Sequence, residues 1–273
     1  MTQVPALPTR LAADEGLARE DSRVPSMRVL LAADGSDSAR IAEAWIVRLR
    51  WAIPPRVDIL CVARPRRLAS GVALQTYRDA VGRAVADLRQ ADLLLALRIA
   101  NSVGERLQSA RLLTRAWARQ GDPASEISAM VRADAPDLLV IGSQGRRGWF
   151  SRHDIASEVI GQVDATVLVT RAVEGGDKPL PHRVAIVPHD GGASGLHAWL
   201  SRAGWLSEAE VVTGAPEVFH DMAAESRPDL VVISRHSGSR VTDHIVRGAL
   251  ESASAVLVLP LPRDYDRNQV PAP

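Results

Sequence analysis

The chain has 273 residues, of which 46% are hydrophobic and 24% are charged, a balance typical of a globular protein. At about 150 residues per domain, this length predicts two domains. The 33 basic residues nearly cancel the 32 acidic ones and leave a formal net charge of +1. Net charge therefore gives no reason to propose nucleic acid or an anionic membrane as the partner, and we expect neither.

The single cysteine, Cys61, lies in an apolar run, which predicts a buried and inert thiol. One cysteine cannot form an intramolecular disulfide, so nothing in the sequence points to secretion. Residues 1–26 contain acids and prolines and lack the continuous apolar stretch of a signal peptide. The apolar-rich stretch at residues 91–97, which contains one aspartate, is far too short to cross a bilayer. We therefore expect a cytoplasmic protein without a membrane partner.

Strands and helices are predicted to alternate from residue 27 onward. Five short apolar runs predict strands that are buried on both faces: Val29–Ala33, Val57–Val62, Leu112–Ala118, Leu138–Ile141 and Thr166–Val169. Helices are predicted at about 37–52, 73–109, 123–134 and 153–163. Asp122 suits the cap of the third helix, and Pro123 suits its first position. This alternation predicts an α/β fold with an open parallel sheet and right-handed crossovers.

The chain then repeats the pattern in a shorter form. Strands are predicted at 183–187, 209–213, 229–233 and 255–259, and helices at 194–205, 215–226 and 240–252. The second strand and the second helix of the first copy have no counterpart. The expected organisation is a flexible tail at 1–26, a complete unit at 27–172, a linker at 173–182, an abbreviated unit at 183–262 and a flexible tail at 263–273. A unit of about 80 residues is marginal alone, so we expect it to pack on the first unit.

Three matched segments, in the same order, indicate that the two units arose by duplication. The pairs are 27–51 with 182–205, 121–143 with 214–235, and 164–170 with 253–259. Trp45 and Trp51 of the first unit match Trp199 and Trp205 of the second. We expect these tryptophans to pack between the units or on the sheet, with an exposed binding face as the alternative. The long helix predicted at 73–109 either covers the sheet edge that the short unit exposes or contacts another chain.

The segments VLLAADGSDSA (29–39), GDPASEI (121–127), PDLLVIGSQGRRG (136–148) and VLVT (167–170) resemble the universal stress protein family, in a tandem form. The resemblance implies two units of the adenine-nucleotide α-hydrolase-like type, which is a Rossmann-like fold. It also implies that the last strands of the two units pair, so that the chain forms an internal pseudo-dimer. One branch of the family binds ATP.

In that branch, the phosphate loop reads Gly-x-x-Gly, nine residues and then Gly-Ser or Gly-Thr. The first half matches here, because Gly142, Ser143 and Gly145 follow a strand and Gly148 comes soon after. The Gly-Ser position falls on Ile155-Ala156, or on His153-Asp154 if the loop is shortened. Asp34 matches the family's aspartate after the first strand. The resemblance therefore gives half an ATP site: Asp34, Gly142, Ser143, Gly145 and Gly148.

Other chemistries receive less support from the sequence. ADGSDS (33–38) partly matches the Ser-Gly-Gly-x-Asp-Ser of ATP pyrophosphatases, but a turn in which Ser36 or Asp37 caps a helix explains it better. The loop of the second unit has Ser234 in place of the first glycine, and we expect no nucleotide there. The seven histidines show no ligand spacing, so no metal site is predicted. No catalytic residue is assigned.

By this resemblance, we expect a stress-response regulatory or binding protein with a degenerate nucleotide pocket, acting through an unidentified protein partner. The alternative is an ATP-binding stress protein that uses the first unit, with at most slow hydrolysis. A cofactor is not expected in the first case, and ATP would occupy the first unit in the second. A homodimer is compatible with either.

Overall fold

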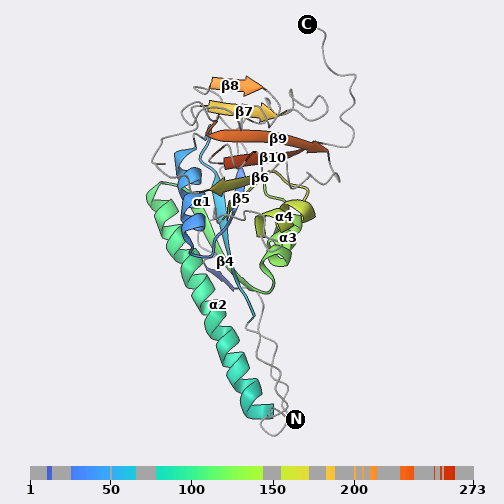
Figure 1. Cartoon of the computed structure of the whole chain (residues 1–273). Helices are drawn as coiled ribbons and strands as arrows, with labels where there is room; N and C mark the ends of the chain where they lie inside the picture. Colours follow the sequence, from blue (N-terminus) through green and yellow to red (C-terminus); the bar gives the residue numbers. More distant parts are fainter. Residues whose placement is uncertain are drawn as a thin grey trace.

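The structure is a computed structural model. It describes residues 11–13, 26–49, 51–65, 78–143, 155–171, 183–187, 210–213, 228–236 and 255–261, and the single positions 200, 205, 249 and 253. Figure 1 shows a long sheet with helices on both of its faces.

Five parallel strands form the sheet of the first unit, as the sequence predicts. They are β2 (Arg28–Ala32), β3 (Arg56–Ala63), β4 (Leu113–Gln120), β5 (Leu138–Ser143) and β6 (Val167–Arg171). Their spatial order is β4-β3-β2-β5-β6, so the sheet grows outward in both directions from β2. A doubly wound parallel sheet of this kind requires helical crossovers on both faces.

Four helices supply these crossovers: α1 (Asp37–Arg48), α2 (Arg78–Ser109), α3 (Pro123–Asp134) and α4 (Ile155–Gln162). α1 and α2 cover one face of the sheet, and α3 and α4 cover the other (Figure 1). α3 begins as predicted, because the Asp122 side chain accepts a hydrogen bond from the Ser125 amide at 3.0 Å. The prediction that the first helix runs to residue 52 is wrong. Leu49 is extended, with φ −63° and ψ 135°, and this ends α1 at Arg48.

The second unit contributes four described strands: β7 (Arg183–Val187), β8 (Glu210–Thr213), β9 (Leu230–His236) and β10 (Ala255–Leu261). They are parallel to one another in the order β10-β9-β7-β8. β10 pairs antiparallel with β6, with Val256 opposite Val169 and Leu257 opposite Leu168. The last strands of the two units therefore join them into one ten-stranded sheet.

β8 occupies an unexpected place in this sheet. By sequence, β8 corresponds to β4, because each precedes a matched Gly-x-Pro segment at 121 or 214. In space, β8 pairs directly with β7, which is the place that β3 takes beside β2. The described part of the second unit has no counterpart of β3 and α2. There, the following strand lies next to the first one, and the sheet stays continuous.

The assignment of residues 1–26 to a flexible tail needs correction. Leu11–Ala13 form β1, which pairs antiparallel with β4. β4 would otherwise be the edge strand of the first unit, and an extended segment can satisfy its free backbone groups. The linker predicted at 173–182 and the tail predicted at 263–273 lie outside the described residues.

The core lies in two layers that run through both units. Alternate strand residues face α1 and α2 on one side, and α3 and α4 on the other. Leu200 and Trp205 of the second unit belong to the first layer, whereas Ala249 and Ala253 belong to the second. The Trp205 ring packs edge-on against Trp51 of the first unit, with centroids 5.5 Å apart and an interplanar angle of 74°. These two matched tryptophans confirm the expected packing between units.

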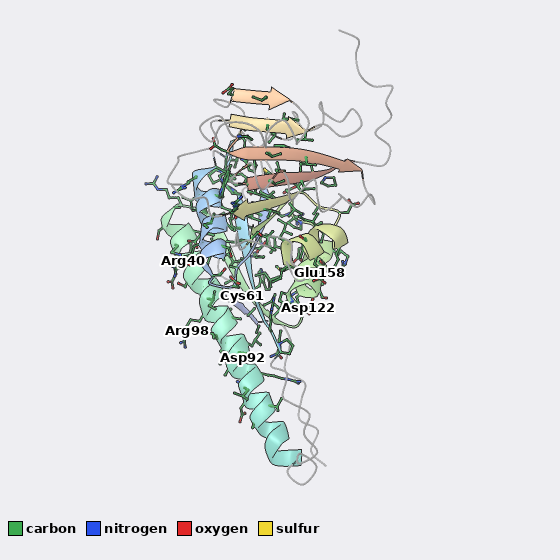
Figure 2. All side chains as sticks on the ribbon, viewed as in Figure 1. Arg40, Cys61, Asp92, Arg98, Asp122 and Glu158 are labelled. Carbon is green, nitrogen blue, oxygen red and sulfur yellow. The ribbon has the colours of Figure 1, made fainter. Side chains whose placement is uncertain are left out.

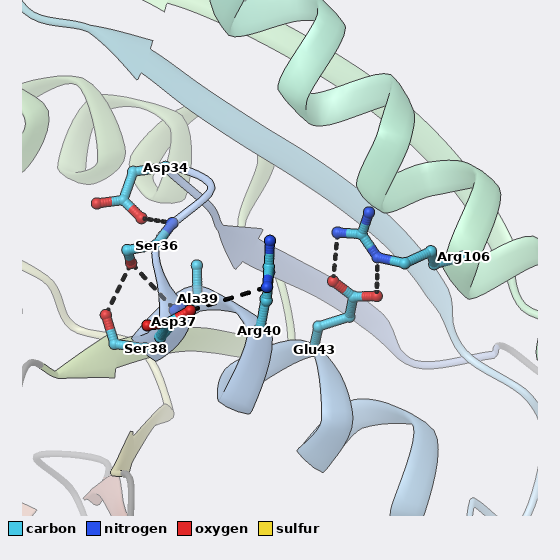
Figure 3. Close-up of polar contacts among 8 residues, drawn as sticks. All are labelled: Asp34, Ser36, Asp37, Ser38, Ala39, Arg40, Glu43 and Arg106. Atoms are coloured by element: carbon cyan, nitrogen blue, oxygen red, sulfur yellow. Dashed lines mark hydrogen bonds and ion pairs between the residues drawn. The ribbon is translucent and has the colours of Figure 1, made fainter.

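A charged pair ties the two helices of the first layer together. The Arg106 guanidinium on α2 donates to both carboxylate oxygens of Glu43 on α1, at 2.7 and 2.8 Å (Figure 3). The same guanidinium donates to Ser102 Oγ at 3.0 Å. Only 8% of the surface of Glu43 is exposed, so its carboxylate is largely desolvated. The bidentate hydrogen bonds from Arg106 compensate for this desolvation.

Candidate functional site

The first unit contains a cavity of about 470 Å³ at the carboxyl ends of β2, β3 and β5. The chain leaves β2 toward β3 on one side, and β5 lies on the other, so the cavity sits at the point where the strand order reverses. Open α/β sheets bind their ligands at this position. The volume lies within the range of about 300–1,000 Å³ that is usual for small-molecule sites.

The turn after β2 forms one wall of the cavity. Asp34 lines it, and Asp34 Oδ1 also accepts a hydrogen bond from the Ser36 amide at 2.9 Å (Figure 3). Gly35 has φ +78°, which suits glycine at this turn. Ser36 Oγ then caps α1 by accepting from the Ala39 amide at 3.3 Å. This geometry confirms the interpretation of ADGSDS as a capped turn.

Gly142, near the end of β5, forms the floor beside this turn. A Cβ at this position would overlap the Ser38 carbonyl group and come within 3.0 Å of the Ala39 amide nitrogen. Both neighbours are backbone atoms at the start of α1. A glycine is therefore required here for packing, whether or not a ligand approaches.

The start of α4 forms the opposite wall. Ile155 lines the cavity with an apolar side chain, and Ala156 is buried with 1% of its surface exposed. Neither residue carries a hydroxyl group. The amide groups at a helix start favour an anion, but the residue of this helix start that lines the cavity is an isoleucine, whose side chain adds no polar group.

Arg64, just after β3, also lines the cavity, and the sequence analysis missed it. Its position could have been predicted from the sequence. Arg64 follows a predicted buried strand, and the carboxyl ends of parallel strands meet at this edge of the sheet. Asp122 lies nearby, and the Ser125 amide bound to its carboxylate holds the pKa of Asp122 below its usual value, with Arg64 contributing less. Among the described lining residues, the charged side chains are thus one acid, Asp34, and one base, Arg64.

Cys61 lies on β3, three residues before Arg64. It is buried, with 3% of its surface exposed. Burial raises the pKa of its thiol from 9.0 to about 12, and the negative charge of Asp34 adds to the effect. At neutral pH the thiol is therefore protonated and out of reach of solvent, as the sequence predicts.

This thiol gives a direct test. At pH 8, we expect Cys61 to stay unmodified by a chromogenic disulfide reagent in the folded protein and to react at once in guanidinium chloride. Between pH 9 and about 12, the unfolded thiol ionises and the folded one does not, so the folded state loses stability as the pH rises. Cys61→Ala is expected to remove this part of the alkaline loss. Rapid labelling of the folded protein at pH 8 would contradict the assignment.

The family model for universal stress proteins matches residues 26–171, which is more than half of the chain. The chain belongs to the universal stress protein family. A universal stress protein from Archaeoglobus fulgidus matches in structure with a TM-score of 0.51 and 12% identity, over 85% of this chain and 98% of that one. At this identity, the likeness shows a shared fold. No curated protein matches the chain in sequence.

Two further solved structures are also similar to the chain. A functionally unknown protein from Pseudomonas aeruginosa has a TM-score of 0.48 and 13% identity, over 88% of this chain and 94% of that one. A family member from Arabidopsis thaliana, solved with AMP bound, has a TM-score of 0.38 and 18% identity, over 57% of this chain and 98% of that one.

The fold brings some of the predicted site residues of this universal stress protein together. Asp34 and Gly142 meet at the cavity. Ser143 is the last residue of β5 and is buried with 1% exposed, but it is not among the lining residues. Gly145 and Gly148 lie outside the described residues. In the second unit, Ser234 lies within β9, and the loop from residue 237 onward lies outside the described residues.

Two negative findings concern only the part of the chain that the structure describes. There, the structure holds no cluster of three or more His, Cys, Asp or Glu residues suited to a metal ion. No described helix is long and apolar enough to cross a membrane.

Proposed function

We propose that this universal stress protein is a regulatory binding protein without catalytic activity, which acts through protein contacts in the stress response. Its first-unit cavity is a degenerate nucleotide pocket that does not hold the phosphates of ATP. The observation that carries the proposal is Ile155, an apolar residue that lines the cavity at one of the two places where the family's Gly-Ser pair can fall.

Electrostatics supports the same proposal. A triphosphate is stabilised by convergent donors and positive charge, as in glycine-rich loops followed by a helix start. In the described wall, Arg64 supplies one positive charge and Asp34 cancels it. Ala156 offers no hydroxyl group to complete a cradle. The described residues therefore do not fit the phosphate part of the ligand.

Nucleotide binding by the first unit is the second candidate. The observation that favours it is the open cavity of about 470 Å³ at the reversal point of the strand order, with Arg64 and Asp34 on its wall. In this case Asp34, Gly142, Ser143, Gly145 and Gly148 would contact ATP, and any hydrolysis would be slow.

A variant that restores the family's Gly-Ser pair at positions 155 and 156 distinguishes between the two candidate functions. We expect the purified protein to carry no adenine nucleotide and to give no binding heat at millimolar ATP. The double variant Ile155→Gly, Ala156→Ser is expected to bind ATP with a Kd at least tenfold below the millimolar concentration at which the wild type gives no heat. The reason is that one hydrogen bond to a charged group contributes about 1.5–3 kcal/mol, and 1.4 kcal/mol is tenfold in affinity.

The control is Gly161→Ser, which lies on the same helix, where an added Cβ meets nothing within 4 Å. It should leave ATP binding unchanged. Bound ATP in the purified protein, or micromolar ATP binding that Gly145→Asp abolishes, would reject the degenerate pocket and establish the second candidate.

A further inference from the structure

The first half of α2 carries an apolar surface that the described part of the chain leaves uncovered. Its exposed residues Ala84, Leu88, Ala91 and Leu95 are spaced by four, three and four positions, and we call them the apolar stripe. Leu88 is 41% exposed, Leu95 is 54% exposed, and the neighbouring Leu94 is 50% exposed. Such spacing places the side chains on one face of a helix.

α2 has a second, separate face that packs on its own sheet. This face comprises Ala96, Ala100, Val103 and Leu107, all buried against β3 and β4. At 100° per residue, the two faces point about 120° apart. Among the described side chains of α2, those before Ala96 include none that is buried. Figure 1 shows this part of α2 extending past the end of the sheet. The apolar stripe therefore serves no contact within the described chain.

We propose that the apolar stripe pairs with the same stripe of a second copy of this chain, with the two α2 helices antiparallel. The spacing of four and three is that of a coiled-coil seam. With Leu88 opposite Leu95 of the second copy, each leucine meets a leucine, and the alanines between them allow close approach. A self-complementary patch of this kind suits a two-fold dimer. The inference is independent of what the cavity binds.

The charges beside the stripe favour the antiparallel direction. Asp87 and Arg98 are both exposed and lie on the same flank of the stripe. Arg98 projects away from the sheet (Figure 2). In the antiparallel pair, Asp87 lies near Arg98 of the second copy, and the contact occurs twice. In a parallel pair, Asp87 would face Asp92 of the second copy twice. The antiparallel pair sets Asp92 against Asp92 of the second copy only once, at the two-fold axis, so it has fewer like-charge contacts.

Sedimentation velocity of the full chain tests the dimer. We expect dimers at micromolar concentration, and at least 100-fold weaker association for the double variant Leu88→Glu, Leu95→Glu. Leu113→Glu is the matched control, because Leu113 is 61% exposed on β4, far from the stripe. It should leave the dimer intact. A monomer at 100 µM wild-type protein, or a dimer that survives both glutamates, would overturn the proposal.

Charge exchange and cross-linking test the direction. Asp87→Arg alone and Arg98→Asp alone should weaken the dimer, and the double exchange should restore it. A short bismaleimide linker should join Ala91→Cys chains, since this position lies at the two-fold axis. It should not join Ala84→Cys chains, whose two copies would be about 22 Å apart along the axis at 1.5 Å per residue. Cys61 is buried and does not interfere. Efficient linking through position 84 would overturn the antiparallel arrangement.

Discussion

Trp205→Ala is expected to lower the free energy of unfolding by about 3–5 kcal/mol, the usual cost of removing a buried tryptophan. Trp205 is 5% exposed and lies in the core layer shared by both units. Its ring contacts Trp51 edge-on at 5.5 Å. Because the sheet is continuous from β4 to β8, we expect this loss to shift one cooperative transition for the whole chain, measured by calorimetry and urea unfolding.

A double-mutant cycle isolates the contact between the units. Trp51→Ala combined with Trp205→Ala should reveal a coupling of about 0.5–1.5 kcal/mol, the range for aromatic pairs. Leu113→Ala, at a largely exposed position, should change stability by less than about 0.5 kcal/mol. Two separate transitions, of which Trp205→Ala moves only one, would mean that the units unfold independently.

The sequence was sufficient to predict the strands of the first unit and the tryptophan contact. Periodicity and capping are local signals, and they placed all five strands of the first unit and the start of α3. Trp51 and Trp205 occupy matched positions in two similar units. Two units related by a pseudo-two-fold axis place matched residues opposite each other, so their contact follows from the repeat.

Strand neighbours were harder to predict, because hydrogen-bond partners are not a local property. Nothing within β8 indicates whether it lies beside β7 or one place farther out. β1 is a three-residue segment whose pairing depends on the open edge of β4. Arg64 was missed for a similar reason, since its role depends on which strand ends meet at the cavity.

The glycine pattern was the least decisive signal at the site. Gly142 fits a phosphate loop and also fits close packing of a helix on a strand, and one sequence cannot separate these causes. The structure shows close packing directly, because a Cβ at Gly142 would overlap the Ser38 carbonyl group. The same helix start is fixed by the Ser36 cap, so the backbone there has little freedom to move.

Gly142→Ala is accordingly expected to lower the free energy of unfolding by about 1–3 kcal/mol without any nucleotide present, the range for overpacked core positions. The added Cβ must displace backbone atoms of Ser38 and Ala39 rather than a flexible side chain. Urea unfolding monitored by far-UV circular dichroism measures this loss.

Gly161→Ala is the matched control, because it adds the same methyl group in α4, where nothing lies within 4 Å. It is expected to stabilise the protein by up to about 1 kcal/mol, since alanine favours a helix over glycine. Opposite signs for these two substitutions would mark Gly142 as a packing glycine. Equal stability of Gly142→Ala and wild type would instead leave ligand binding as the reason for that glycine.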